Sequence, residues 1–192
     1  MKVVKFQARV DEAKCIGDKL CQTVCPSGAI RLDGNKSRVD DQKCVACNNC
    51  WDICPEEAVS LVTRSEPLLL GVNPRESNQD ELVKLCIDAH LHPRQFICLC
   101  TATRVEEVAA AILKGACSLE DITMMTGACS GCTVYCTEPM LRLLKARGID
   151  PDLQEGRRLY DISPTLWDVP EDVIRKYPGY YLEEDKGVFR KI

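Results

Sequence analysis

The sequence predicts an α+β fold built from three successive parts, and three observations support this prediction. A cysteine run occurs twice within residues 1–64, and each copy is followed by a similar apolar segment, which predicts a repeated unit of short helices and strands. Capping residues and apolar residues at helical spacing predict a mainly helical part at 94–148, reached through a linker with one helix at 65–93. Four prolines and six of the ten aromatic residues fall in 149–192, which predicts an extended C-terminal arm.

The two cysteine runs define the first part of the chain. The second run reads C-x2-C-x2-C-x3-C-P, with its cysteines at Cys44, Cys47, Cys50 and Cys54. The first run keeps this frame with Cys15, Cys21 and Cys25, but Asp18 stands in its second cysteine position. Each run predicts a short helix that carries its last cysteine, followed by a turn and a strand. The apolar stretch Val3–Val10 predicts a further strand.

This spacing resembles that of bacterial two-cluster ferredoxins, in which the last cysteine of each run binds the other run's 4Fe-4S cluster. The resemblance implies a ferredoxin-like, pseudo-two-fold cluster domain over residues 1–64. It also implies two crossed ligand sets. Cluster 1 takes Cys15, Asp18, Cys21 and Cys54, and cluster 2 takes Cys25, Cys44, Cys47 and Cys50. Zinc is the alternative cofactor, but zinc sites usually draw four ligands from two separated pairs.

Asp18 is the departure from the ferredoxin pattern. A carboxylate is a harder ligand than a thiolate, so one iron of cluster 1 is expected to be held less firmly. Two outcomes are open if Asp18 lies at that iron: it binds and a 4Fe-4S cluster persists, or the iron is lost and a 3Fe-4S cluster remains. In the remaining alternative, Asp18 is only a surface turn residue.

The linker is expected to contain one helix. Ser77 and Asp80 resemble a capping box. Leu82, Leu85, Cys86 and Ala89 follow at helical spacing, and Pro93 ends the run. Cys86 is expected to pack in the apolar face of this helix, because an unmodified cysteine behaves as a small hydrophobe.

The third part is expected to open with a short strand and continue with helices. Gln95–Leu99 has the character of a strand. Thr103 with Glu106, and Ser118 with Asp121, predict capping boxes for two helices that end near Gly115 and Gly127. Thr137 is expected to cap a third helix, which ends before Gly148.

This part carries a second cysteine pattern: Cys98-x-Cys100, then residues 101–131, then Cys132. The stretch resembles bacterioferritin-associated ferredoxin-like domains, which hold a 2Fe-2S cluster with C-x-C, about 31 residues, then C-x2-C. The resemblance implies a small helical iron–sulfur domain with Cys98, Cys100 and Cys132 as ligands. The pattern breaks at the fourth ligand, which we assign to Cys136, with Cys129 in reserve. The altered spacing leaves both a 2Fe-2S and a 4Fe-4S cluster open, and bare zinc is the alternative.

Composition and charge exclude several classes of protein. The 25 basic and 29 acidic residues give a net charge of −4, which is too balanced to favour binding to nucleic acid or to a membrane surface. The opening residues lack the apolar run of a secretion signal, and no stretch reaches the length of a membrane span. We therefore expect a cytoplasmic protein whose 14 cysteines are reduced or metal-bound. Only two histidines, His90 and His92, are present, and no catalytic motif is recognised. The chain is therefore not expected to be an enzyme on its own.

These features together predict a multi-cluster electron-transfer subunit. The overall layout resembles the electron-transfer subunit of tungsten benzoyl-coenzyme A reductase, of the aldehyde:ferredoxin oxidoreductase group of anaerobes. That resemblance implies a larger catalytic redox subunit with tungsten or molybdenum as partner, and leaves room for a further electron donor. A regulatory or cluster-transfer protein is the alternative. The arm at 149–192 either covers its own domain or docks on the partner, with Trp167, Tyr180 and Tyr181 as anchors.

Overall fold

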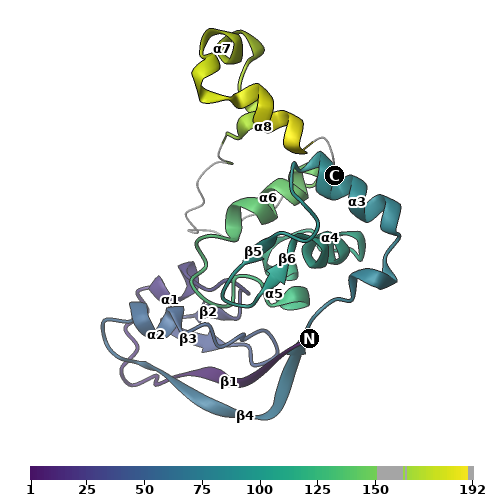
Figure 1. The fold of residues 1–192 in the computed structure, drawn as a ribbon. Helices are drawn as coiled ribbons and strands as arrows, with labels where there is room; N and C mark the ends of the chain where they lie inside the picture. Colours follow the sequence, from purple (N-terminus) through teal and green to yellow (C-terminus); the bar gives the residue numbers. More distant parts are fainter. Residues whose placement is uncertain (151–161, 163, 190–192) are drawn as a thin grey trace. The chain divides into compact units, whose positions relative to one another are not determined.

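In the computed structural model, which describes residues 1–150, 162 and 164–189, two antiparallel strand pairs form the N-terminal part (Figure 1). Strand β1 (Lys2–Val10) pairs with β4 (Val59–Leu70), and β2 (Ile30–Asp33) pairs with β3 (Lys36–Val39). The predicted strand at Val3–Val10 is confirmed. The short helices α1 (Leu20–Thr23) and α2 (Asn49–Ile53) follow the two cysteine loops and contact each other. The part is therefore mixed helix and strand, as expected, while its pseudo-two-fold symmetry stays a prediction.

Strand β4 is longer than the sequence suggested, because it continues through Pro67 to Leu70. Residues 64–67 form a bulge opposite Lys5, between the pairs Phe6–Thr63 and Val4–Leu68. A bulge tolerates proline, since the residues in it do not take part in the regular ladder of hydrogen bonds. The expectation that residues 65–70 belong to a linker is therefore wrong at the level of secondary structure.

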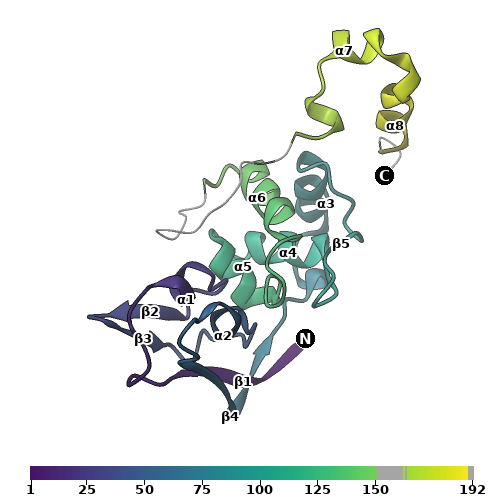
Figure 2. The same ribbon diagram turned by 90° about the vertical axis from the view of Figure 1, so that its left-hand side faces the viewer.

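Four helices and a two-strand ribbon form the next part. The helices are α3 (Gln79–Asp88), α4 (Val105–Leu113), α5 (Leu119–Thr126) and α6 (Thr137–Ala146), preceded by the 3-10 turn η1 (Pro74–Glu76); the ribbon pairs β5 (Phe96–Cys98) with β6 (Thr103–Arg104). Helix α4 lies centrally and contacts α3, α5 and α6, and α5 lies on the side nearest the strands, where it contacts β4 (Figure 2). The mainly helical character of this part was predicted correctly.

The starts of α3 and α4 each lie one residue later than predicted. Asn78, and not Ser77, caps α3, because its side chain accepts hydrogen bonds from the N–H groups of Asp80 and Glu81. Helix α4 is preceded by Arg104, whose N–H donates to Glu107 Oε1 at 2.9 Å. The predicted cap Thr103 is instead buried, and its hydroxyl bonds to Thr101 and Lys2. A contact with a distant residue therefore displaced the local capping signal.

The two later caps gave one correct and one incorrect prediction. Ser118 Oγ accepts a hydrogen bond from Asp121 N–H, and Asp121 Oδ2 accepts one from Ser118 N–H, so this capping box is confirmed. Helix α6 begins one residue earlier than expected, with Cys136 at its N-cap. Thr137 Oγ1 donates instead to the carbonyl of Thr133 at 3.0 Å, so it stabilises the preceding loop.

Lys2 joins the strand part to the helical part. Its ammonium group donates to Thr103 Oγ1 at 2.8 Å and to the carbonyl of Thr126, and pairs with Glu107 Oε2 at 3.3 Å. Gly127 has φ +76°, and a Cβ there would lie 2.7 Å from Lys2 Cδ. We call this arrangement the Lys2 clamp. The clamp helps to explain why the strand part and the helical part belong to one compact unit, Met1–Leu159.

The described residues of the second unit, Tyr160–Ile192, include four short helical elements. Helix α7 (Glu171–Lys176) lies between the 3-10 turns η2 (Leu166–Asp168) and η3 (Pro178–Tyr180), and α8 (Leu182–Phe189) follows. Ile174 is buried, and Lys186 pairs with Glu171 Oε1 at 3.1 Å. The predicted extended arm is therefore wrong here. Pro170 and Pro178 stand at the starts of helical turns, where proline is tolerated, and do not break them. Residues 151–161, including Tyr160, lie outside the described residues.

None of the helices in the described part of the chain has the length and apolar character needed to cross a lipid bilayer.

Candidate metal centres

The two cysteine loops of the N-terminal part have matching backbones. In the first loop Gly17 and Lys19 adopt positive φ, +74° and +67°. Ala46 and Asn48 do so at the corresponding positions of the second loop, with φ +52° and +71°. Left-handed backbone is costly for residues other than glycine, so its repetition at matched positions indicates that both loops wrap their side chains in the same way.

One cavity is lined by the whole predicted cluster 1 set: Cys15, Asp18 and Cys21 from the first run, and Cys54 from the second. Backbone N–H groups point at two of the sulfurs, from Ser37 to Cys15 at 3.5 Å and from Ala58 to Cys54 at 3.4 Å. The hydrogen bond from Ser37 lowers the pKa of Cys15. Such N–H groups stabilise thiolate sulfur, which is the form that binds metal.

Asp18 lines this cavity although its side chain is largely exposed. Its Oδ1 accepts a hydrogen bond from Leu20 N–H at 3.1 Å. Cys47 stands at the matching place in the second loop, and its sulfur is bonded in the same way by the N–H two residues on, that of Asn49. The carboxylate of Asp18 thus occupies the position of a ligand sulfur. The turn bond engages one carboxylate oxygen, so the structure is compatible with both a turn role and a ligand role.

A second cavity is lined by the predicted cluster 2 set: Cys25, Cys44, Cys47 and Cys50. Ala8 N–H donates to Cys44 Sγ and Ala29 N–H donates to Cys25 Sγ, both at 3.2 Å. Burial raises the pKa of Cys47 to about 11 and of Cys50 to about 12, with the neighbouring thiols adding to the effect. The structure therefore places Cys25, from the first run, among the cysteines of the second run.

The third group contains five cysteines, one more than predicted: Cys98, Cys100, Cys129, Cys132 and Cys136. Cys100 Sγ lies 3.6 Å from Cys132 Sγ, and Cys129 Sγ lies 3.0 Å from Cys136 Sγ. The thiols of Cys98 and Cys136 are hydrogen-bonded to each other. Cys100 and Cys132 are exposed, whereas the other three are buried. The reserve candidate Cys129 is thus brought into the site together with the four assigned cysteines.

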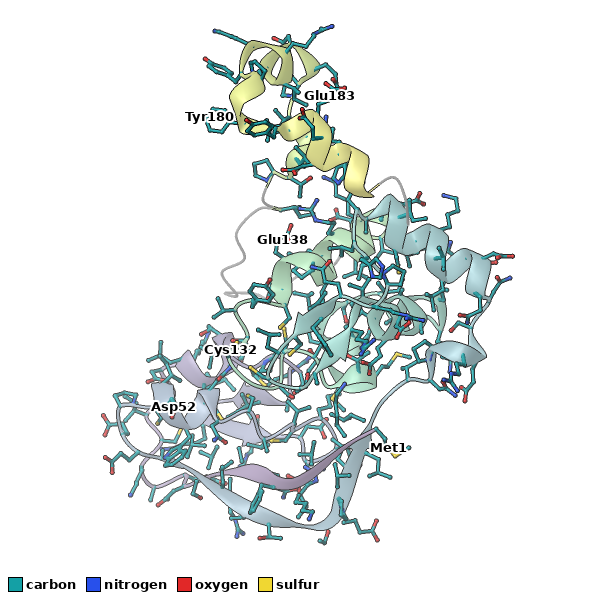
Figure 3. All side chains as sticks on the ribbon, viewed as in Figure 1. Met1, Asp52, Cys132, Glu138, Tyr180 and Glu183 are labelled. Atoms are coloured by element: carbon teal, nitrogen blue, oxygen red, sulfur yellow. The ribbon has the colours of Figure 1, made fainter. Side chains whose placement is uncertain are left out.

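The backbone after Cys132 adopts a strained conformation that directs two N–H groups at the Cys132 sulfur. Thr133 is a β-branched residue with φ +57°, which is a marked outlier for such a side chain. This conformation lets the N–H groups of Val134 and Tyr135 point at Cys132 Sγ, where they lower its pKa. Thr133 Oγ1 donates to the carbonyl of Cys132 at 2.8 Å, which supports the turn. Cys132 lies on the side of the helical part nearest α1 and α2 (Figure 3).

The two remaining cysteines lie apart from these groups. Cys86 is fully buried in α3, as expected for a packing residue. Cys117 is exposed and bonds to Asp121 Oδ2 at 3.3 Å. No disulfide joins any of the fourteen cysteines, all of which lie within the described residues. The structure therefore sorts the cysteines into three groups and two single positions.

The thiols of the first two groups line cavities. Among the described residues, no group of three or more His, Cys, Asp and Glu side chains is spaced to hold a single metal ion. Zinc requires sulfurs about 2.3 Å from one ion, so its ligands crowd together, whereas a cluster keeps its ligands further apart. In the first two groups, the N–H groups that point at the sulfurs fit iron–sulfur clusters.

Two family models match the chain. Residues 8–61 match the 4Fe-4S dicluster domain, and residues 96–146 match the BFD-like [2Fe-2S] binding domain. The chain carries two iron–sulfur domains. The searches of curated proteins and of solved structures gave no significant match. The second match favours a 2Fe-2S cluster at the third group, and the two domains together indicate an electron-transfer role. Which cysteines bind each cluster stays a prediction.

Two residues near these groups were not singled out from the sequence. Asn49 Nδ2 lies 3.3 Å from Thr133 Oγ1 and 3.5 Å from the carbonyl of Val24. Thr133 follows Cys132, and Val24 precedes Cys25. No periodicity or motif signals such a contact, because the residues it joins are far apart in the sequence. Only the position of Asn49 inside the second cysteine run hinted at its place near a cluster.

Proposed function

We propose that this chain is a multi-cluster electron-transfer subunit that relays electrons to or from a larger catalytic subunit. When bound, each cluster takes up and releases single electrons. The crossed sets around the two cavities hold two 4Fe-4S clusters, the one beside Asp18 being 4Fe-4S or 3Fe-4S. The third group holds a 2Fe-2S cluster, with a 4Fe-4S cluster as the other possibility.

The observation that carries this proposal is the contact between the second and third groups. Asn49 stands immediately before Cys50, and its amide links the residue before Cys25 to the residue after Cys132. The second group is thus joined to the third through one side chain. The first and second groups share one core, in which Cys21 packs with Cys25, Cys44 and Cys50. Three groups in series within one unit suit a relay better than three independent sites.

The exposed end of the third group supports docking of a redox partner. Three large apolar side chains near these cysteines are largely exposed. Leu99 lies between Cys98 and Cys100, and Val134 and Tyr135 follow Cys132 by two and three residues. Large apolar side chains at the surface mark interaction sites when they gather around a functional group. In this proposal the partner covers these side chains and the two exposed cysteines, Cys100 and Cys132.

The partner that we propose is a tungsten- or molybdenum-containing catalytic subunit of the benzoyl-coenzyme A reductase type. Support comes from the order of two iron–sulfur domains followed by an aromatic-rich unit. In that unit Tyr177, Tyr180 and Tyr181 are exposed over at least two-fifths of their surface. Tyrosine is enriched at protein interfaces, because it combines a large apolar ring with a polar tip. A further electron donor would contact another face of the chain.

An electron-counting experiment tests the relay. The chain is purified without oxygen, reduced with dithionite, freed of reductant and mixed with a one-electron acceptor or with an apo-ferredoxin. We expect repeated cycles of reduction and oxidation with iron and sulfide contents unchanged. Movement of iron and sulfide to the apo-ferredoxin, with little electron transfer, would support the alternative of a cluster-transfer protein. The exposure of Asp18 is the observation that favours that alternative.

A further inference from the structure

The third group has more thiols than one cluster with four cysteine ligands uses. Four thiolates complete the coordination of either a 2Fe-2S or a 4Fe-4S cluster. Five thiols gather here, and the exposed pair Cys100 and Cys132 is distinct from the buried members. The extra thiol is therefore one of the three buried cysteines, Cys98, Cys129 and Cys136.

Cys129 and Cys136 reach the same place from two different elements. Cys129 lies in the loop after α5, and Cys136 lies at the N-cap of α6. Their sulfurs are 3.0 Å apart, and the side chains are 0% and 1% exposed. The N–H of Cys129 points at the sulfurs of both Cys98 and Cys136. A metal ion that binds one of the two sulfurs is thus within a short movement of the other.

Neither residue has the surroundings of a cysteine that only fills space. Cys86 is the reference for that role, since it is buried on an apolar helix face beside Leu82 and Leu85. Cys129 instead adopts φ +64°, which is unfavourable for any residue with a Cβ. Its sulfur faces Cys136, the hydroxyl of Thr137 at 3.7 Å and Met140 Sδ at 3.9 Å. These neighbours are polar or polarisable, which suits a sulfur that takes part in metal binding.

Because the two sulfurs lie 3.0 Å apart, either of them can reach the same iron. We propose that Cys129 and Cys136 are interchangeable ligands for one coordination position of the third cluster. In the exchange, the incoming thiol would lose its proton and bind iron, while the leaving thiolate would release iron and take up that proton. No electron is gained or lost. The inference rests on the proposed third cluster.

The test uses the full chain, purified anaerobically, with Cys129→Ala, Cys136→Ala and the double variant. Alanine is chosen because it cannot bind iron. Cys132→Ala serves as the reference without the third cluster, and Cys117→Ala as the control for loss of an unrelated thiol. Iron and sulfide contents, together with the visible circular dichroism of the third cluster, report occupancy. Far-ultraviolet circular dichroism and the signals of the two 4Fe-4S clusters report that each variant is folded.

We expect each single variant to keep at least half of the wild-type occupancy of the third cluster, and the double variant to fall to the level of Cys132→Ala. The inference is overturned if one single variant falls to that level while the other matches wild type, since a single fixed ligand would then be established. Retention of the cluster in the double variant would also overturn it. If wild type and Cys132→Ala have equal iron contents, the third centre itself is refuted, which is a failure of the proposed function and not of the exchange.

Discussion

At the scale of single residues, Asp18 is expected to decide how the proposed first cluster responds to oxygen. Its carboxylate occupies the place that Cys47 takes in the second loop. Because oxygen is a harder ligand than sulfur, brief exposure to air is expected to release the iron beside Asp18. We expect a 3Fe-4S signal in the electron paramagnetic resonance (EPR) spectrum of wild type, and at least a tenfold weaker signal in Asp18→Cys.

A matched control for Asp18 is available in the same loop. Asp11 Oδ1 accepts a hydrogen bond from Ala13 N–H at 2.9 Å, which is the same turn bond, but Asp11 does not line the cavity. Asp11→Cys should therefore leave the 3Fe-4S signal as in wild type. An equally strong signal in Asp18→Cys would show that Asp18 is not at the labile iron.

The crossed ligand sets give a second prediction at this scale. Cys25 lies among Cys44, Cys47 and Cys50, while Cys54 lies with Cys15 and Cys21. Cys25→Ser is expected to damage the second cluster and to keep the 3Fe-4S signal that reports on the first. Cys54→Ser is expected to remove that signal. EPR spectra and iron contents of both variants check this, and the opposite pattern would show that each run binds its own cluster.

Cys86 gives a prediction about pH. Burial raises its pKa in the folded chain to about 12, above the ordinary value of 9.0. The folded state therefore favours the neutral thiol. Its contribution to stability is complete below pH 9 and is lost as the pH rises towards 12, by up to about 1.4 kcal/mol per pH unit. The free energy of unfolding of Cys86→Ala, measured with denaturant, should decline less steeply over this range than that of wild type. Parallel declines would contradict the prediction.

At the scale of elements, the Lys2 clamp holds the strand pair against the helical part. Its ammonium group makes three polar contacts with limited access to water. Hydrogen bonds to charged groups contribute about 1.5–3 kcal/mol each, so Lys2→Met is expected to cost about 2 kcal/mol of unfolding free energy. Amide hydrogen exchange in residues 103–107 and 126–127 should also become faster.

Lys5 is the control for this element. It lies on the same strand and is exposed, opposite the bulge at 64–67. Lys5→Met should change the unfolding free energy by less than about 0.5 kcal/mol. If both substitutions lowered the unfolding free energy equally, the loss would come from removing a positive charge from β1 and not from breaking the Lys2 clamp.

The elements that were predicted correctly from the sequence have a local signal. The strand at Val3–Val10 and the box Ser118–Asp121 follow from the local pattern. The crossed cysteine sets follow from the resemblance to two-cluster ferredoxins, and the structure brings the members of each set together. Two of the errors have non-local causes. Thr103 is drawn away from its capping role by Lys2, and β4 is extended by pairing with Lys2–Val4. The contact of Asn49 with Thr133 joins residues far apart in the chain, which no pattern reveals.

At the scale of the whole molecule, the second unit is expected to bind the catalytic partner. Tyr180 and Tyr181 are exposed, so Tyr180→Ser with Tyr181→Ser should leave all clusters intact. Binding to the isolated tungsten or molybdenum subunit, measured by size-exclusion chromatography, should weaken at least tenfold. Removal of residues 162–192 should abolish it. Unchanged affinity of the shortened chain would show that this unit does not serve the partner.

The Lys2 clamp also has a consequence for biosynthesis. Lys2 donates to the carbonyl of Thr126, which is 124 positions further along the chain and is therefore synthesised later. Domains generally fold from the N-terminus as they emerge, but this end of β1 has to wait for most of the helical part. Contacts of such long range also slow folding, because the loop must be closed before they form. Assembly of the first two cysteine groups can therefore begin early in translation, while the edge of the sheet that carries Lys2 closes last.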